Sequence, residues 1–209
     1  MNKLEKSLKT TECIEVYVCK TDRFSSFSEL PAYAVKELES VSRPCLRAQK
    51  RCIYGLLAYA TENGLGEKWN PQKLLKNDVG KPIADGWFCS LSHTEQLVAV
   101  AVARKSVGID LERENRFVSE RFFEHVLHET DVWTTDKEQL IRLWTKKEAL
   151  FKQRGTEKVF HPKHINVRHG EFKTVEVRFL GKRYFLSVAF DGFSDVRIYP
   201  LDREIYICE

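Results

Sequence analysis

The sequence predicts an α+β fold made of two similar α/β subdomains, each with helices packed on a mainly antiparallel sheet. Segments with the spacing of amphipathic helices precede strand-like segments in the first half of the 209-residue chain, and the same order recurs in the second half. No linker rich in Pro, Gly or Ser separates the halves. We therefore expect residues 1–104 and 105–209 to pack tightly as a pseudo-duplication, although no internal sequence identity supports one.

The first half contains an early strand, two helices and a pair of strands. The early segment alternates and is rich in β-branched residues, which is typical of a strand. Pro31 fits the first position of one helix, and Asn63-Gly64 provides a stop for the next. The last strand is apolar throughout, so we expect both of its faces to be buried. The predicted ranges are 14–19, 31–41, 44–64, 87–93 and 97–103.

The second half begins with a strand, continues with two helices and ends with three strands. Ser119 is a suitable cap for the first helix, and Gly155 ends the second. The tail strands alternate and are joined by short turns that contain Gly or Asp. The predicted ranges are 106–112, 118–127, 136–153, 171–180, 183–190 and 195–201.

Composition excludes several classes of protein. With 43% hydrophobic and 31% charged residues, the chain is not predominantly disordered. Its net charge of +4 fits an anionic ligand or partner but does not indicate nucleic-acid binding. No apolar run approaches the roughly 20 residues of a membrane helix, and the N-terminus lacks the apolar core of a signal peptide. The six cysteines form neither a C-x-x-C pair nor a zinc pattern, so we expect a reducing, cytoplasmic location.

The segment SVGIDLE places two carboxylates on one side of a strand. Alternate residues of 107–111 point into the core, so Asp110 and Glu112 share the opposite face, about 7 Å apart. Two acids this close repel each other unless a cation lies between them. Mg²⁺ is a suitable cation, because it binds oxygen ligands and keeps positions open for phosphate oxygens. The alternative is a solvated strand face whose acids pair with Arg113 or Lys105.

The segment LWTKKEALFK places a third acid on a helix. Trp144, Glu148 and Lys152 follow each other at intervals of four residues and share one face, whereas Lys147 points away from Glu148. Glu148 and Lys152 could form only a solvated pair, worth about 0.3–0.5 kcal/mol. Trp144 argues against this alternative, because tryptophan is unusual on a fully solvated face.

Basic and hydroxyl residues supply candidate contacts for an anion. Ser92 and His93 end a strand, and Gly80 and Lys81 lie in a loop that could hold a phosphate. Arg47 lies near a helix N-terminus, where a cation is unfavourable unless an anion binds there. A structural histidine and a solvated loop lysine are the alternatives. The basic residues that could replace Arg47 are Arg43, Lys50 and Arg51.

Taken together, these motifs resemble the 4′-phosphopantetheinyl transferases. The motifs, in order, are Gly-Lys-Pro at 80–82, Ser-His at 92–93, VGIDLE at 107–112 and WTKKEALFK at 144–152. Chain length and the order of elements resemble the larger, single-chain, surfactin-synthetase-activating (Sfp) type. The resemblance implies a holo-acyl-carrier-protein synthase, which transfers the 4′-phosphopantetheine arm of coenzyme A to a serine of an apo carrier protein and releases 3′,5′-ADP.

The resemblance also implies roles for residues. Asp110, Glu112 and Glu148 would ligate Mg²⁺, and Asp110, Glu148 and Lys152 would be catalytic. Glu148 would take the serine proton directly or through a water, with a metal-bound water as the alternative base. The first half would bind the nucleotide, and the site would lie between the halves. The residues that would contact coenzyme A are Arg47, Gly80, Lys81, Ser92, His93 and Lys152.

The expected partner is an acyl or peptidyl carrier protein, which is typically acidic. Segment 116–123, with Arg113, could form its docking surface on a chain that we expect to be monomeric, with no nucleic-acid or membrane partner. Two other functions remain open. One is a different Mg²⁺-dependent hydrolase of diphosphates or phosphodiesters, and the other is a non-catalytic module that binds anions. The sequence leaves the identity of the carrier, and Mg²⁺ against Mn²⁺, undecided.

Overall fold

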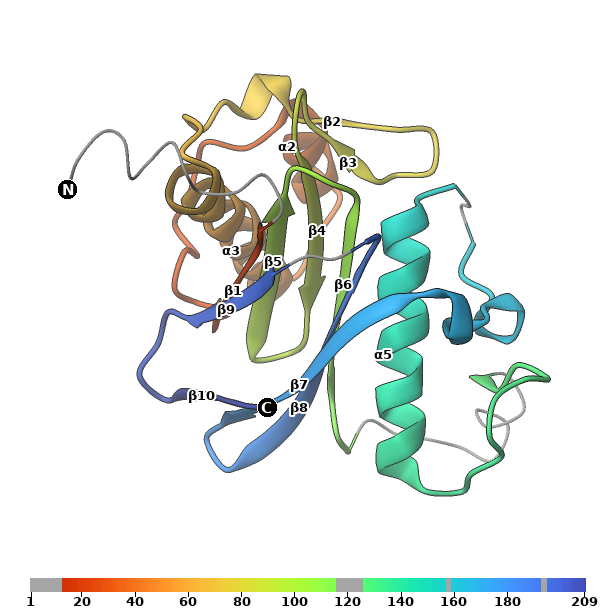
Figure 1. Ribbon diagram of the computed structural model, residues 1–209. Helices are drawn as coiled ribbons and strands as arrows, with labels where there is room; N and C mark the ends of the chain where they lie inside the picture. Colours follow the sequence, from red (N-terminus) through yellow and green to blue (C-terminus); the bar gives the residue numbers. More distant parts are fainter. Residues whose placement is uncertain (1–12, 116–125, 157–158, 193–194) are drawn as a thin grey trace, which may run out of the picture.

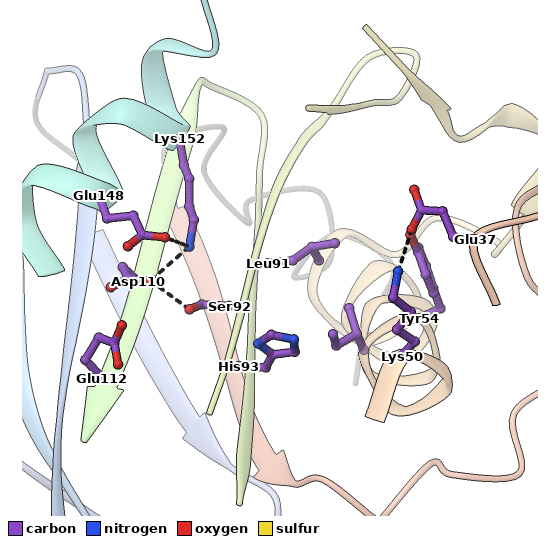
Figure 2. Close-up of a pocket in the computed structure, with 11 residues that line it drawn as sticks. Glu37, Lys50, Tyr54, Leu91, Ser92, His93, Asp110, Glu112, Glu148 and Lys152 are labelled. Carbon is purple, nitrogen blue, oxygen red and sulfur yellow. Dashed lines mark hydrogen bonds and ion pairs between the residues drawn. The ribbon is translucent and has the colours of Figure 1, made fainter. Parts of the chain in front are cut away.

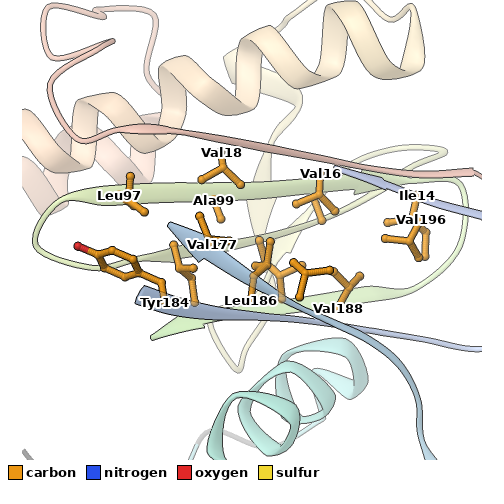
Figure 3. Packing of buried hydrophobic residues seen from close by; sticks show 14 of the residues in the cluster. Ile14, Val16, Val18, Leu97, Ala99, Val177, Tyr184, Leu186, Val188 and Val196 are labelled. Atoms are coloured by element: carbon orange, nitrogen blue, oxygen red, sulfur yellow. The ribbon is translucent and has the colours of Figure 1, made fainter. Parts of the chain in front are cut away.

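A computed structural model describes residues 13–115, 126–156, 159–192 and 195–209 (Figure 1). Within these ranges the chain forms two four-stranded sheets and one two-stranded sheet. The two larger sheets pack face to face around an apolar core, with helices on their outer faces (Figure 3). The order of layers is therefore helix, sheet, sheet, helix, which confirms the predicted α+β class.

The first sheet has the strand order β4-β5-β1-β9. β5 pairs antiparallel with both β1 and β4, and β9 runs parallel to β1. All seven residues of β5 are buried, as its apolar sequence predicts, because one face meets the second sheet and the other meets the helices. The strands are β1 (Cys13–Lys20), β4 (Phe88–His93), β5 (Leu97–Ala103) and β9 (Asp195–Pro200).

The helices α2 (Ala32–Glu39) and α3 (Pro44–Ala60) cover the outer face of the first sheet. Helix α3 begins at Pro44, as predicted, whereas Pro31 is the N-cap of α2 rather than its first helical residue. The chain then continues as a π-helical turn, η1 (Thr61–Leu65), and stops at Gly66 with φ of 69° rather than at Asn63-Gly64. The short elements that follow are η2 (Pro71–Lys73), β2 (Leu75–Lys76) and β3 (Pro82–Ile83).

The second sheet has the strand order β10-β7-β8-β6, and all its pairs are antiparallel. The tail does not stay in this sheet, because β9 crosses to pair with β1 and only β10 returns. The division of the chain at residues 104 and 105 stays a prediction. The strands are β6 (Val107–Arg113), β7 (Glu171–Phe179), β8 (Lys182–Phe190) and β10 (Ile205–Cys208).

Helix α5 (Lys137–Arg154) covers the outer face of the second sheet. Its N-cap, Asp136, accepts a hydrogen bond from the Glu138 amide at 2.9 Å, and Gly155 ends it with φ of 58°. A Cβ added to Gly108 of β6 would lie 1.9 Å from the Ala149 carbonyl oxygen. Gly108 therefore allows α5 to lie directly against β6.

The remaining short elements, η3 (Pro162–His164) and η4 (Val167–His169), follow α5. The helix predicted at 118–127 lies almost wholly outside the described residues. All six cysteines are free thiols. Among the residues placed by the structure, no helix is both long enough and apolar enough to cross a bilayer.

Candidate active site

A cavity of about 400 Å³ lies where the two sheets meet (Figure 2). Acidic residues of β6 and α5 line one wall, and residues of α2 and α3 line the opposite wall. The end of β4 lies between the two walls. The lining residues are Glu37, Lys50, Ile53, Tyr54, Leu91, Ser92, His93, Asp110, Glu112, Glu148 and Lys152.

The acidic wall unites the three carboxylates that the sequence singles out. Asp110 and Glu112 lie on β6, and Glu148 reaches them from α5. One ligand atom from each of the three lies within 4.8 Å of the others. Val107, Ile109 and Leu111 point into the core, as the alternation of the strand predicts. The carboxylates therefore face α5 because the apolar residues of β6 face the first sheet.

Asp110 is the most buried of these acids, with 3% of its surface exposed. Its Oδ1 accepts hydrogen bonds from Ser92 Oγ and Lys152 Nζ, both at 2.9 Å. Its Oδ2 is buried and accepts no hydrogen bond from the described residues. Burial raises the pKa of Asp110. The positive charge of Lys152 acts against this increase, and the negative charge of Glu148 adds to it.

Lys152 lies between two of the acids. Its Nζ is 2.9 Å from Asp110 Oδ1 and 3.3 Å from Glu148 Oε1. Burial acts to lower the pKa of Lys152, but the two carboxylates outweigh it and raise the pKa. Lys152 therefore stays protonated at neutral pH and offsets one of the negative charges on this wall.

The donor set fits a hard divalent cation. Three carboxylates from two elements converge, and oxygen ligands of this kind are those that Mg²⁺ prefers. The buried Oδ2 of Asp110 is an acceptor to which no described residue donates, and such an atom is costly unless something binds it. A cation at this position would bind that oxygen and reduce the repulsion between the acids.

Ser92 forms a hydrogen bond with Asp110. Its hydroxyl oxygen accepts a hydrogen bond from the Leu111 amide at 3.1 Å and donates its proton to Asp110. Two residues earlier on β4, Ser90 Oγ accepts a hydrogen bond from the Ile109 amide at 2.9 Å. These two serines join the edge of β4 to the edge of β6 and so connect the two sheets. The coenzyme A contact expected for Ser92 stays a prediction.

His93 and Lys81 lie at different places relative to the acids. His93 is exposed on the wall of the cavity. Lys81 and Gly80 instead line an adjoining cavity of about 280 Å³, which shares Tyr54 and Lys152 with the first. Lys81 Nζ donates to the Gln153 carbonyl oxygen at 2.7 Å.

The loop that carries Lys81 is therefore fastened to the C-terminal end of α5. A cation is favourable there, because the carbonyl groups at a helix C-terminus carry partial negative charge. Burial lowers the pKa of Lys81. Asn77 adds a second contact, from its Nδ2 to the Gly155 carbonyl oxygen at 3.3 Å.

Arg47 does not line either cavity. Its side chain is exposed and its Nε donates to the Val41 carbonyl oxygen. The basic residue of α3 that reaches the cavity is Lys50, which the sequence offers only as an alternative. The position of Lys50 one turn farther along the helix, on the side that faces β4, accounts for this difference.

Trp144 does not line the cavity with Glu148 and Lys152, although the helical spacing groups the three. Its ring packs edge-on against that of Phe160, with 5.0 Å between the ring centroids, and Phe160 also contacts Phe151. The aromatic side chain therefore has a packing partner in the segment that follows α5, which the sequence pattern alone does not reveal.

Lys147 points away from Glu148, as expected, and is fully buried. Its Nζ lies 2.6 Å from Asp131 Oδ2 and donates to the carbonyl oxygens of Val126 and Pro162 at 2.6 and 3.0 Å. These three contacts use all three donors of the ammonium group. Lys147 thereby joins two segments to α5 on the side opposite the acids.

Sequence reasoning missed Glu37 and Lys76. Glu37 lines the cavity from α2, and Lys76 of β2 lines the adjoining cavity and forms an ion pair with Glu37. Neither residue lies in a motif. The only available signal is the half-buried position of Glu37 on a helix whose apolar face is fixed by Ala34 and Leu38.

Two comparisons with known proteins find similarities to this chain. Residues 106–203 match the family model described as the 4′-phosphopantetheinyl transferase superfamily. The chain is also similar to 4′-phosphopantetheinyl transferase gsp of Aneurinibacillus migulanus, with 34% identity over 91 residues. That alignment covers 38% of this chain and 37% of the relative's length. The segment that carries all three acids of the site is therefore similar to the 4′-phosphopantetheinyl transferase superfamily.

Proposed function

We propose that the protein transfers the 4′-phosphopantetheine group of coenzyme A to a serine of an apo carrier protein, with Mg²⁺ as cofactor. The observation that carries the proposal is the convergence of Asp110, Glu112 and Glu148 in one cavity, with Lys152 beside two of them. The match of residues 106–203 to the transferase superfamily and the name of the similar protein support it.

The reaction forms one bond and breaks one. The serine oxygen attacks the phosphorus that carries the pantetheine arm, and the bond from that phosphorus to the bridging oxygen of the diphosphate breaks. The leaving group is 3′,5′-ADP, and the serine proton passes to a base. Reactions of this type depend mainly on positioning and on neutralisation of charge.

Asp110, Glu112 and Glu148 would hold the Mg²⁺, whose charge would neutralise the diphosphate of coenzyme A. Ser92 and Lys152 keep Oδ1 of Asp110 in place, so that its Oδ2 is available to a ligand. Lys152, which lies 3.3 Å from Glu148, would also place a positive charge beside a diphosphate bound to that cation. These residues therefore orient the coenzyme and stabilise the negative charge of the leaving group.

Glu148 is the proposed base. It reaches the cavity from α5, across from the acids of β6, and about a quarter of its side chain is exposed. Part of the side chain therefore remains accessible to a serine that enters the cavity. The ion pair with Lys152 holds the Glu148 side chain toward the cavity.

The test is to incubate the protein with coenzyme A, Mg²⁺ and a panel of apo acyl and peptidyl carrier proteins, then to weigh the carriers. We expect one phosphopantetheine on a carrier serine and an equal amount of 3′,5′-ADP. Asp110→Asn and chelation by EDTA should abolish both products. Glu39→Gln is the matched control, because Glu39 is an exposed acid of α2 outside the cavity.

Two results would contradict the proposal. Hydrolysis of coenzyme A at the same rate with and without a carrier would indicate a diphosphate hydrolase. Absence of coenzyme A binding would exclude the coenzyme as substrate and favour a site for another anion.

A further inference from the structure

A cluster of one acid and two lysines lies across the cavity from the three carboxylates, where Glu37 and Lys50 line the cavity and Lys76 lines the adjoining one. Glu37 of α2 pairs with Lys50 of α3, as Figure 2 shows, and also with Lys76 of β2. Its Oε2 is 2.8 Å from Lys50 Nζ, and its Oε1 forms an ion pair with Lys76 Nζ. Lys76 Nζ also lies 4.7 Å from the centre of the Tyr33 ring. A single carboxylate therefore bridges two ammonium groups from two other elements.

This bridge is maintained by charge. Burial acts to raise the pKa of Glu37, but the two lysines outweigh it and hold the pKa below its usual value of 4.5. Glu37 is therefore ionised at neutral pH. The cluster contains two positive charges and one negative charge, so one positive charge remains uncompensated within it.

The two sides of the cavity carry groups of opposite charge and could bind different parts of one ligand. The acidic wall fits a divalent cation that would carry a diphosphate, and the opposite wall presents cations to any second anionic group of the same ligand. Both lysine side chains are about one-third exposed, so an incoming anion can reach them. In the absence of a ligand, Glu37 occupies the donors that such an anion would use.

We propose that Glu37 is an internal counter-anion, which a second anionic group of the ligand displaces from Lys50 and Lys76. The inference rests on the proposed function, in which the ligand is coenzyme A and its 3′-phosphate is the group remote from the diphosphate. A phosphate carries up to two negative charges and three acceptor oxygens, whereas Glu37 has one charge and two oxygens. The phosphate can displace the carboxylate, but a neutral hydroxyl at the same position cannot.

Glu37 would therefore make binding selective. Lysines without a counter-anion would attract small anions, and Glu37 reduces that attraction. A ligand must supply both the diphosphate for the acidic wall and the second charge for the lysines. The residue would increase discrimination between coenzyme A and ligands that lack the second anionic group, at some loss of absolute affinity.

Calorimetric titration of Glu37→Gln with coenzyme A and with dephospho-coenzyme A, which lacks the 3′-phosphate, tests the proposal. We expect Glu37→Gln to bind coenzyme A about two- to fivefold more tightly than wild type, the range expected for loss of a partly exposed ion pair. The affinity for dephospho-coenzyme A should change little. Glu39→Gln removes the same charge from α2 outside the cavity and should change neither affinity. The gain should diminish in 0.5 M salt, because salt screens exposed charges.

Unchanged or weaker binding of coenzyme A by Glu37→Gln would overturn the proposal, because Glu37 would then orient the lysines rather than compete for them. An equal gain for both ligands would also overturn it. If wild type binds no coenzyme A, the proposed function fails, and a second probe decides the role of Glu37. In EDTA, inorganic pyrophosphate should raise the melting temperature of Glu37→Gln more than that of wild type, and equal shifts would exclude a counter-anion.

Discussion

Ser92 Oγ lies 2.9 Å from Oδ1 of Asp110, so a strand of the first sheet holds an acid that belongs to the second. The same hydroxyl accepts a hydrogen bond from the amide of Leu111, on the strand that carries Asp110. Because an amide always donates and a carboxylate accepts, the serine proton must point at Asp110. The orientation of Asp110 therefore depends on contact between the two sheets.

Replacement of Ser92 by Ala should lower the affinity for Mg²⁺ by roughly ten- to a hundredfold, the range seen for groups that hold metal ligands in place. The coordinating oxygens remain, so high Mg²⁺ should restore much of the activity. The measurement is the transfer rate as a function of Mg²⁺ concentration. Ser90→Ala is the matched control, because it removes the equivalent bond to the Ile109 amide but no contact to an acid. Equal effects of the two substitutions would contradict a role specific to Asp110.

Gly108→Ala should separate α5 from β6. The added Cβ would lie 1.9 Å from the Ala149 carbonyl oxygen and 2.4 Å from the Gln153 amide nitrogen, and both are backbone atoms. We expect a loss of at least about 2 kcal/mol in the free energy of unfolding, at the upper part of the range for overpacking. Urea denaturation measures this loss.

Gly181→Ala is the comparison for Gly108→Ala. Its φ of 72° is unfavourable for alanine, but no atom lies within 4 Å of the added Cβ. It should cost about 1–2 kcal/mol from backbone conformation alone and leave the Mg²⁺ dependence unchanged. If Gly108→Ala were the milder of the two, the close approach of α5 to β6 would be wrong.

Lys147→Met should destabilise the protein strongly, because it leaves Asp131 buried without its cationic partner. Removal of one member of a buried ion pair costs about 3–5 kcal/mol. Lys146→Met is the matched control on the neighbouring, half-exposed residue and should cost less than about 1 kcal/mol. Thermal and urea unfolding measure both. Similar stability of the two variants would show that the buried pair contributes little.

Local pattern was sufficient to predict the acidic face of β6 and the extent of α5. Alternation sets which side chains of a strand share a face, and Asp136 and Gly155 mark the ends of the helix. Pairing between distant segments carries no such local signal. The tail strands read alike in sequence, yet β9 joins β1 in the first sheet, while β7 and β8 pair in the second.

The same distinction holds within the site. Asp110, Glu112, Glu148 and Lys152 lie together because each is fixed by the periodicity of its own element. Lys81 instead contacts the C-terminal end of α5. The sequence pattern does not reveal this contact, because the partner of a loop lysine depends on how the loop packs. Glu37 was missed for a related reason, since its two lysines come from a different helix and a different strand.

The central claim is that carboxylates from β6 and α5 form one divalent cation site in the cavity. Calorimetric titration of Mg²⁺ in the presence of coenzyme A tests it most directly, with wild type, Asp110→Asn, Glu148→Gln and the control Glu39→Gln. We expect one Mg²⁺ per chain in wild type and the control, and at least tenfold weaker binding in both site variants. Equal Mg²⁺ affinity in all four proteins would contradict it.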